Sequence, residues 1–165
     1  MKVMVGICMG VLAGALLVSG CSTTPQSEAQ QAQLATKTQT AVERAKQADP
    51  GLQKFFDTAA GYTVFPSVGK GGVGVGGAYG RGQVFEAGQV VGYSTLTQAS
   101  IGFQLGGQTY TELIFFEDKA ALERFKAGNF AFYAQASAVA LKSGVSANAK
   151  YTNGVAVFTL GEKGL

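Results

Sequence analysis

The residues best suited to chemistry lie between Ser67 and Gly82, where eight glycines surround two cations, Lys70 and Arg81. Glycine-rich segments with a lysine can hold phosphate groups, and G-x-G-x-x-G occurs twice here. The dinucleotide fingerprint, however, needs a helix after the glycines and an acid about 20 residues on. Here the pattern of a strand continues instead, and residue 92 is glycine. Lys70 is followed by glycine rather than by the Ser or Thr of a Walker loop, so we expect no nucleotide site.

Three short patterns resemble the motifs of penicillin-recognising enzymes. Residues 67–70 fit S-x-x-K, residues 146–148 fit S-x-N, and residues 142–144 resemble K-T-G. Their order is reversed, no helix begins at Ser67, and the chain is short for that fold. Histidine is absent, which removes the usual general base near neutral pH, and no cluster of acids suggests a metal site. We therefore expect a protein without enzymatic activity, cofactor or metal.

The N-terminus has the pattern of a secretory signal: Lys2, an apolar run from Val3 to Val18, and small residues before Cys21. The run is too short for a comfortable transmembrane helix, which needs about 20 apolar residues. The sequence Val-Ser-Gly-Cys at 18–21 resembles a bacterial lipobox, which predicts a signal peptide over 1–20 and lipidation of Cys21. An ordinary signal peptide with an incidental cysteine is the alternative. Ser22, in place of an aspartate, favours the outer membrane, so we expect a lipid anchor there, facing the periplasm.

Composition limits the class of the remaining chain. Without Lys2 there are 12 cations against 10 anions (13 Lys+Arg minus one), which is not the strongly basic balance of a nucleic-acid binder. Without Cys8, in the leader, and the lipidated Cys21, no cysteine remains for a disulfide. Residues 21–28 are predicted to form a lipidated tether, and 29–165 a single domain.

Hydrophobic periodicity predicts an α+β fold. A thin stripe of alanine and leucine indicates a helix over 29–48, and Asp49-Pro50 can cap a second one before Gly61. The period then changes to two, with strands expected at 62–65, 72–79, 82–87, 89–95, 99–106 and 109–116. A helix is expected over 118–128, and strand patterns resume in 129–141 and 154–160. This predicts N-terminal helices packed on a curved, glycine-rich antiparallel sheet, as a sandwich or barrel-like arrangement.

In the predicted strand 72–79, one face carries almost no side chains, because it consists of Gly72, Gly74, Gly76 and Ala78, whereas Val73, Val75, Gly77 and Tyr79 point the other way. Glycine within a strand usually marks a bend or a close approach of another backbone. We therefore expect another element, or a ligand, to lie directly on this backbone.

Residues 59–85, "AAGYTVFPSVGKGGVGVGGAYGRGQVF", resemble the signature of the SYLF domain family. Further similar segments are "ASIGFQLGGQ" at 99–108, "TELIFF" at 111–116 and "GNFAFYAQASAVA" at 128–140, so the resemblance spans about 29–160. It implies a domain that binds phosphoinositide membranes in eukaryotic relatives and, in some, actin filaments; bacterial relatives are often secreted or lipidated. The positions that match the motif as structural glycines are Gly71, Gly74, Gly76, Gly77, Gly80 and Gly82.

The resemblance and the residues together predict an outer-membrane lipoprotein that binds lipid or anionic membrane surfaces. Membrane phospholipid is expected as anchor and possible ligand, and neither a nucleotide nor a nucleic acid is expected as a partner. An envelope module that binds an unknown protein partner without specific lipid recognition is the alternative. In relatives the helix before the motif contributes to lipid contact; here that region carries Lys37, Arg44, Lys46 and Lys54. The candidates for contact with lipid headgroups are Lys70, Arg81, Lys46 and Lys54.

Overall fold

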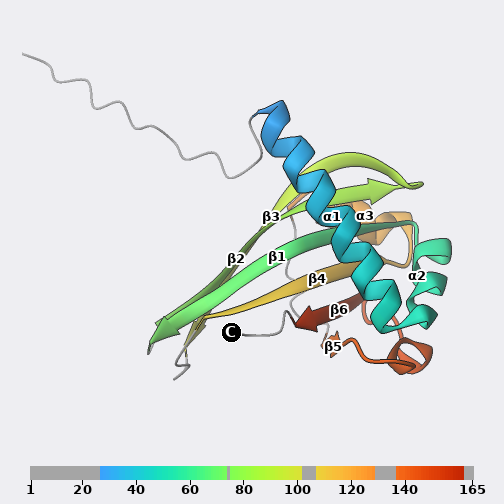
Figure 1. Cartoon of the computed structure of the whole chain (residues 1–165). Coiled ribbons are helices and arrows are strands. Elements are labelled where there is room, and N and C mark those ends of the chain that lie inside the picture. Colours follow the sequence, from blue (N-terminus) through green and yellow to red (C-terminus); the bar gives the residue numbers. More distant parts are fainter. Residues whose placement is uncertain (1–26, 74, 102–106, 129–136, 162–165) are drawn as a thin grey trace, which may run out of the picture.

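The computed structural model describes residues 27–73, 75–101, 107–128 and 137–161. In this part of the chain, helices lie on both faces of a six-stranded sheet (Figure 1). Helices α1 (Glu28–Ala48) and α2 (Gln53–Thr58) cover one face, and α3 (Lys119–Lys126) packs on the other. The predicted α+β class is confirmed.

The N-terminal helices begin and end at the capping residues that the sequence indicates. Ser27 accepts the N–H of Gln30 at the start of α1, and its buried residues Leu34, Thr38, Ala41 and Ala45 recur every three to four positions. Asp49 then caps the 3-10 helix η1 (Pro50–Leu52), with Pro50 in the first turn, and α2 continues from it.

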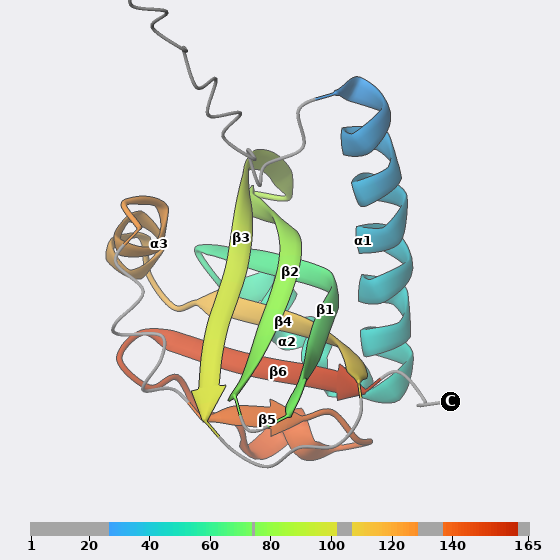
Figure 2. The ribbon, with the colours of Figure 1, turned by 90° about the vertical axis from the view of Figure 1, so that its left-hand side faces the viewer.

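The strands are β1 (Gly61–Val73), β2 (Val75–Glu86), β3 (Gln89–Ile101), β4 (Gln108–Phe116), β5 (Ala138–Ala140) and β6 (Val155–Gly161), in the sheet order β3-β2-β1-β4-β6-β5. Figure 2 shows β2 and β3 running across the direction of β4 and β6, so the sheet is strongly twisted. It is not closed into a barrel. All neighbours are antiparallel except β5 and β6, which pair in parallel.

The predicted strand 72–79 is wrong in its boundaries. β1 runs from Gly61 through the first glycines to Val73, and β2 returns from Val75, with Gly71 opposite Gly77 and Gly72 opposite Gly76. The chain thus reverses inside the glycine-rich stretch. A period of two cannot mark this reversal, because glycines carry no side chains whose alternation would change there. The predicted segments 89–95 and 99–106 likewise belong to one strand, β3, as far as Ile101.

A β-bulge interrupts β1 at Pro66 and Ser67. Between Val64 and Val68, β1 has one more residue than β2 and β4 have in the matching interval. β1 lies inside the sheet, where proline is tolerated essentially only at such irregularities because it has no N–H for the ladder. The hydroxyl of Thr111 on β4 donates to the Pro66 carbonyl at 2.9 Å and satisfies it inside the core.

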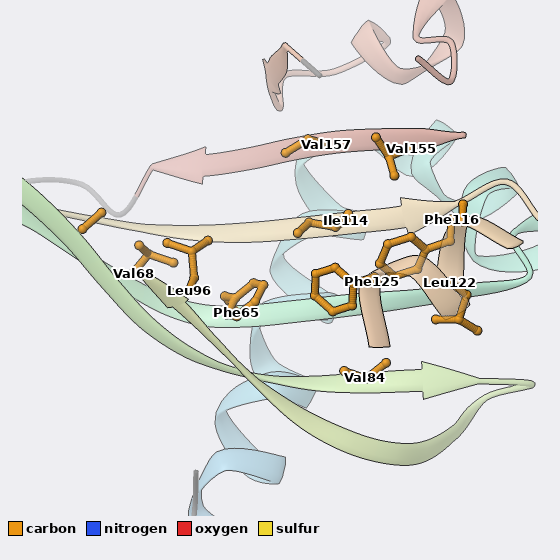
Figure 3. Close-up of a cluster of buried hydrophobic side chains, with 12 residues drawn as sticks. Phe65, Val68, Val84, Leu96, Ile114, Phe116, Leu122, Phe125, Val155 and Val157 are labelled. Carbon is orange, nitrogen blue, oxygen red and sulfur yellow. The ribbon is translucent and has the colours of Figure 1, made fainter. Parts of the chain in front are cut away.

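Two hydrophobic cores lie on opposite faces of the sheet. Figure 3 shows the first, where Phe65, Ile114 and Phe116 from the central strands meet Leu122 and Phe125 from α3. The second lies under α1 and α2, where the Phe55 ring packs against Phe115 and Phe158 at centroid distances of 5.5 and 4.9 Å. Successive residues along β4, and likewise Val64 and Phe65 on β1, therefore point into different cores. The two cores together fix the side of the sheet on which these side chains lie.

Candidate functional site

A groove runs between α1 and the strands β1 and β2. It consists of two adjoining hollows of about 350 and 280 Å³, which share Lys37, Pro66 and Ser67. We call it the α1 groove. Its remaining lining residues are Gln30, Gln33, Leu34, Thr36, Thr40, Ala41 and Arg44 from α1, and Tyr79, Gly80 and Arg81 from β2.

The groove exists because the helix packs on the sheet through small side chains at a point where the strand bulges. The buried stripe of α1 is mostly alanine and threonine, and the bulge places Pro66 and Ser67 at the floor of both hollows. Ser67 is exposed and Pro66 is buried. The lining groups include amides and hydroxyls beside a short apolar floor, a combination that suits a polar ligand.

Three cations from two distant segments converge on this groove. Lys37 and Arg44 come from α1 and Arg81 from β2, and no Asp or Glu is among the residues that line the two hollows. The Nε of Arg81 donates to the Tyr79 hydroxyl at 3.0 Å, which orients the guanidinium. Guanidinium and ammonium groups in one hollow without a lining acid favour an anionic ligand, and phosphate matches the fork of an arginine.

The other predicted cations lie elsewhere. The Nζ of Lys46 stands 4.4 Å from the centre of the Phe56 ring, and that of Lys54 stands 5.0 Å from the centre of the Phe55 ring. Lys54 also donates to the Ala147 carbonyl at 3.3 Å. Lys70 pairs with Ala78 and Gln108 on the part of β1 that leads to the reversal. Of the four predicted headgroup candidates, the structure therefore places only Arg81 in the α1 groove.

The glycines of the motif differ in their surroundings. A Cβ added at Gly82 would lie 2.6 Å from the Val64 carbonyl oxygen and 2.7 Å from the Phe65 ring, and one at Gly80 would lie 2.9 Å from Val68. At these two positions the backbone is in close contact with its neighbours. At Gly77 the nearest atom would be the Gln98 carbonyl oxygen at 3.2 Å, whereas at Gly71 no atom of the described residues outside its chain neighbours lies within 4 Å. Gly76 pairs with Gly72, and Gly74 lies outside the described residues.

The three short patterns that resemble the motifs of penicillin-recognising enzymes do not lie in one site. Ser67 lies on the floor of the α1 groove, whereas Gly144 and Ser146 donate their backbone N–H groups to the carboxylate of Asp49. These two positions therefore bind the carboxylate of a structural acid. Among the described residues, no group of three or more His, Cys, Asp or Glu could hold a metal ion.

Cys21 and the predicted leader over 1–20 lie outside the described residues, as do 129–136 of the predicted strand pattern. Within the described part of the chain, no helix combines the length and apolar character needed to cross a membrane.

The sequence placed Lys37 and Arg44 on the helix that contributes to lipid contact in relatives, but they were not among the predicted headgroup candidates. Their convergence with Arg81 depends on where α1 packs across the sheet, and no local pattern carries that information. The exposure of Val90 and Val91 on β3 was also not predicted. The sequence does indicate it, because two consecutive valines soon after Ala87-Gly88 interrupt the alternation of apolar and polar residues.

The chain is 32% identical over 135 residues to Beta cell expansion factor A of Aeromonas veronii. The match covers 79% of this chain and 50% of that protein, so the chain spans about half the length of the curated relative. No model of a known protein family matches the chain.

Proposed function

We propose that this protein is an outer-membrane lipoprotein of the SYLF type whose domain binds anionic phospholipid headgroups in the α1 groove. The observation that carries the proposal is the convergence of three cations on the two adjoining hollows of this groove, Lys37 and Arg81 in one and Lys37 and Arg44 in the other, with no acidic side chain among the described residues that line them. The SYLF assignment rests on the glycine motif of β1 and β2 and on the order of the similar segments along the chain.

Binding would have two parts. Acyl chains on Cys21 hold the domain at the bilayer, since each buried methylene contributes about 0.8 kcal/mol and two chains give stable anchoring. The tether then raises the effective concentration of the groove near headgroups. Each cation near an anionic surface contributes about 1 kcal/mol, and salt weakens this contribution. The glutamine amides and Ser67 supply hydrogen bonds to the polar part of a headgroup.

The test uses the mature chain with Cys21→Ser, so that the anchor does not mask weak binding, and vesicles with and without phosphatidylglycerol. The double variant Lys37→Gln/Arg81→Gln should bind roughly 30-fold more weakly than the parent, as expected for two cations at about 1 kcal/mol each. Lys70→Gln/Lys142→Gln removes the same charge outside the groove and is the matched control. Equal losses in both pairs would reject the groove in favour of general electrostatic attraction.

Absence of binding to vesicles of any composition would reject lipid recognition altogether. The result would then support the alternative, an envelope module that holds a protein partner. The anchor is tested separately: Cys21→Ala should abolish acylation and release the protein from membranes, and retention of the variant as before would contradict the lipobox assignment.

A further inference from the structure

The hairpin between β2 and β3 carries an unusual apolar tip. Among the described residues, large apolar side chains are exposed at three positions, and two of these are adjacent: Val90, 45% exposed, and Val91, 48% exposed. The third, Tyr79, lies beside the α1 groove and has a hydrogen-bond partner there. Isolated surface valines are common and need no explanation, but adjacent exposed apolar side chains at the end of a hairpin are a candidate contact site.

The backbone explains why two consecutive valines are exposed. Glu86 pairs with Gln89, Phe85 with Val90 and Val84 with Gly92, so Val91 is an extra residue on β3. Such a bulge disturbs the alternation that would otherwise send one of two neighbours inward. β3 is the edge strand of the described sheet, and the bulge therefore presents both side chains outward at its beginning.

The surroundings of the tip suit a lipid–water boundary. Glu86, at the end of β2, is paired with Lys126 at 2.9 Å and approaches Lys119 at 4.0 Å, and Lys126 also pairs with Glu123 at 2.9 Å. Two lysines thus balance the two acids beside the tip, which reduces repulsion from an anionic surface. Tyr93 and Lys126 line a hollow of about 470 Å³ next to Val91. Tyrosine and lysine are residue types that place an apolar stem in lipid and a polar end among headgroups.

The position of the tip relative to the first turn of α1 indicates that the surface facing the tip is the bilayer. In both Figure 1 and Figure 2 the first turn of α1 and the β2–β3 hairpin form the upper side of the domain, whereas the end of β1 and β5 lie low. Five residues lie between Cys21 and Ser27, and the six steps along the chain reach at most about 22 Å. An acyl group on Cys21 would thus keep this side of the domain within reach of the bilayer.

We infer that Val90 and Val91 enter the bilayer interface and orient the anchored domain with its β2–β3 hairpin against the membrane. The inference rests on the anchoring step of the proposed function. The anchor already holds the domain at the surface, so a small apolar contact is sufficient to select one orientation. Lys70, near the reversal of β1, and β5 then face away from the bilayer.

The chain contains no tryptophan, so single-tryptophan reporters can test the orientation. Val91→Trp places one at the tip, and Ala138→Trp places one at an exposed position on β5, the opposite edge strand. Each is introduced into the full acylated protein and reconstituted in vesicles of phosphatidylethanolamine and phosphatidylglycerol with brominated chains. We expect roughly twofold or stronger quenching at position 91, because interfacial side chains reach about 5–10 Å into the boundary, and little at position 138.

A second variant guards against an effect of the reporter itself. Val90→Asp in the Val91→Trp protein should relieve most of the quenching, because a carboxylate resists transfer from water, whereas Ala140→Asp should leave it unchanged. Vesicle flotation of each acylated variant accompanies the measurement. Flotation without quenching at position 91, or with equal quenching at 91 and 138, would overturn the inference alone. Failure of all variants to float would reject the anchor and the inference with it.

Discussion

The carboxylate of Asp49 accepts the backbone N–H of Ser146 at 2.7 Å and so joins two segments that lie 97 residues apart. The same side chain accepts the N–H groups of Gly51 and Gly144 at 3.1 and 3.2 Å. Asp49 is 1% exposed. One buried acid therefore caps the start of η1 and also holds the loop that precedes β6.

Replacement of Asp49 by Ala should destabilise the protein by about 3 kcal/mol, because buried N–H groups lose a charged acceptor. Urea denaturation followed by circular dichroism measures the free energy of unfolding. Asp57→Ala is the matched control: Asp57 is exposed and accepts a local hydrogen bond from Gln53, so its loss should cost less than about 0.5 kcal/mol. Similar costs for both variants would contradict the structural role of Asp49.

Asp49 should also make stability depend on acidity. Burial alone would raise the pKa of its carboxyl, but the hydrogen bonds from Ser146, Gly51 and Gly144 outweigh burial and hold the pKa below the ordinary value of 3.8. A lowered pKa in the folded state stabilises the protein above the unfolded pKa, and this contribution is lost as the pH falls through the folded pKa. The difference in unfolding free energy between the parent and Asp49→Asn should be constant above about pH 5 and shrink below 3.8. A difference that persists undiminished into stronger acid would refute this.

Two glycines of one motif should respond oppositely to alanine. Gly82→Ala places a Cβ against the Val64 carbonyl oxygen and the Phe65 ring, and such overpacking costs about 1–3 kcal/mol. Gly71→Ala enters open space and should be neutral or stabilise by about 0.5 kcal/mol, since alanine loses less backbone entropy. Thermal melts of both variants compare them directly; an equal fall in Tm would show that crowding does not distinguish the two positions.

The turn between β2 and β3 contains an alanine where a different residue fits better. Ala87 and Gly88 both have positive φ, 50° and 76°, and Asn153 and Gly154 have 53° and 82° in the turn before β6. Asparagine tolerates this conformation better than alanine. Ala87→Asn should therefore stabilise by about 0.5–1 kcal/mol, and Asn153→Ala should destabilise by a similar amount. Changes of the same sign in the two variants would be inconsistent with a common turn conformation.

The hydroxyl of Thr111 should contribute measurably to the stability of the protein. Thr111→Val keeps the shape but leaves the buried Pro66 carbonyl without this donor, at a cost of about 1–2 kcal/mol. Thr109, two residues earlier on β4, is partly exposed, and Thr109→Val should change stability by less than about 0.5 kcal/mol. Chemical denaturation of the pair measures the bond, and equal stabilities would show that the carbonyl is satisfied in another way.

Local chemistry allowed the helices and most strands to be predicted. The Asp49-Pro50 pair marks the start of η1 correctly, because a cap and a proline act within three residues. The hydrogen bonds from Gly144 and Ser146 to the same carboxylate could not be predicted, since they depend on where two distant loops meet. The parallel pairing of the short strand β5 is likewise a tertiary choice that alternation does not encode.

The glycine-rich stretch shows the limit of pattern reading. Its strand character was predicted, but the reversal between Val73 and Val75 was not, because bare positions give no change of face. Arg81 was predicted as a candidate cation, but the other cations of the groove, Lys37 and Arg44, come from a helix whose place on the sheet is set by core packing. The same packing separates Lys70 from them, although Lys70 is closer to Arg81 in the sequence than either.

Pro66 has a consequence for how the chain finds its alignment. Strands with many glycines can slide past one another with little penalty, because few side chains distinguish one pairing from the next. A proline in an inner strand resists such slippage, since a shift by one residue would place its missing N–H opposite a carbonyl that needs a donor. The bulge thus fixes the pairing register of β1. Because β1 and β2 are joined by the reversal, it also fixes the register of their glycine-rich ends.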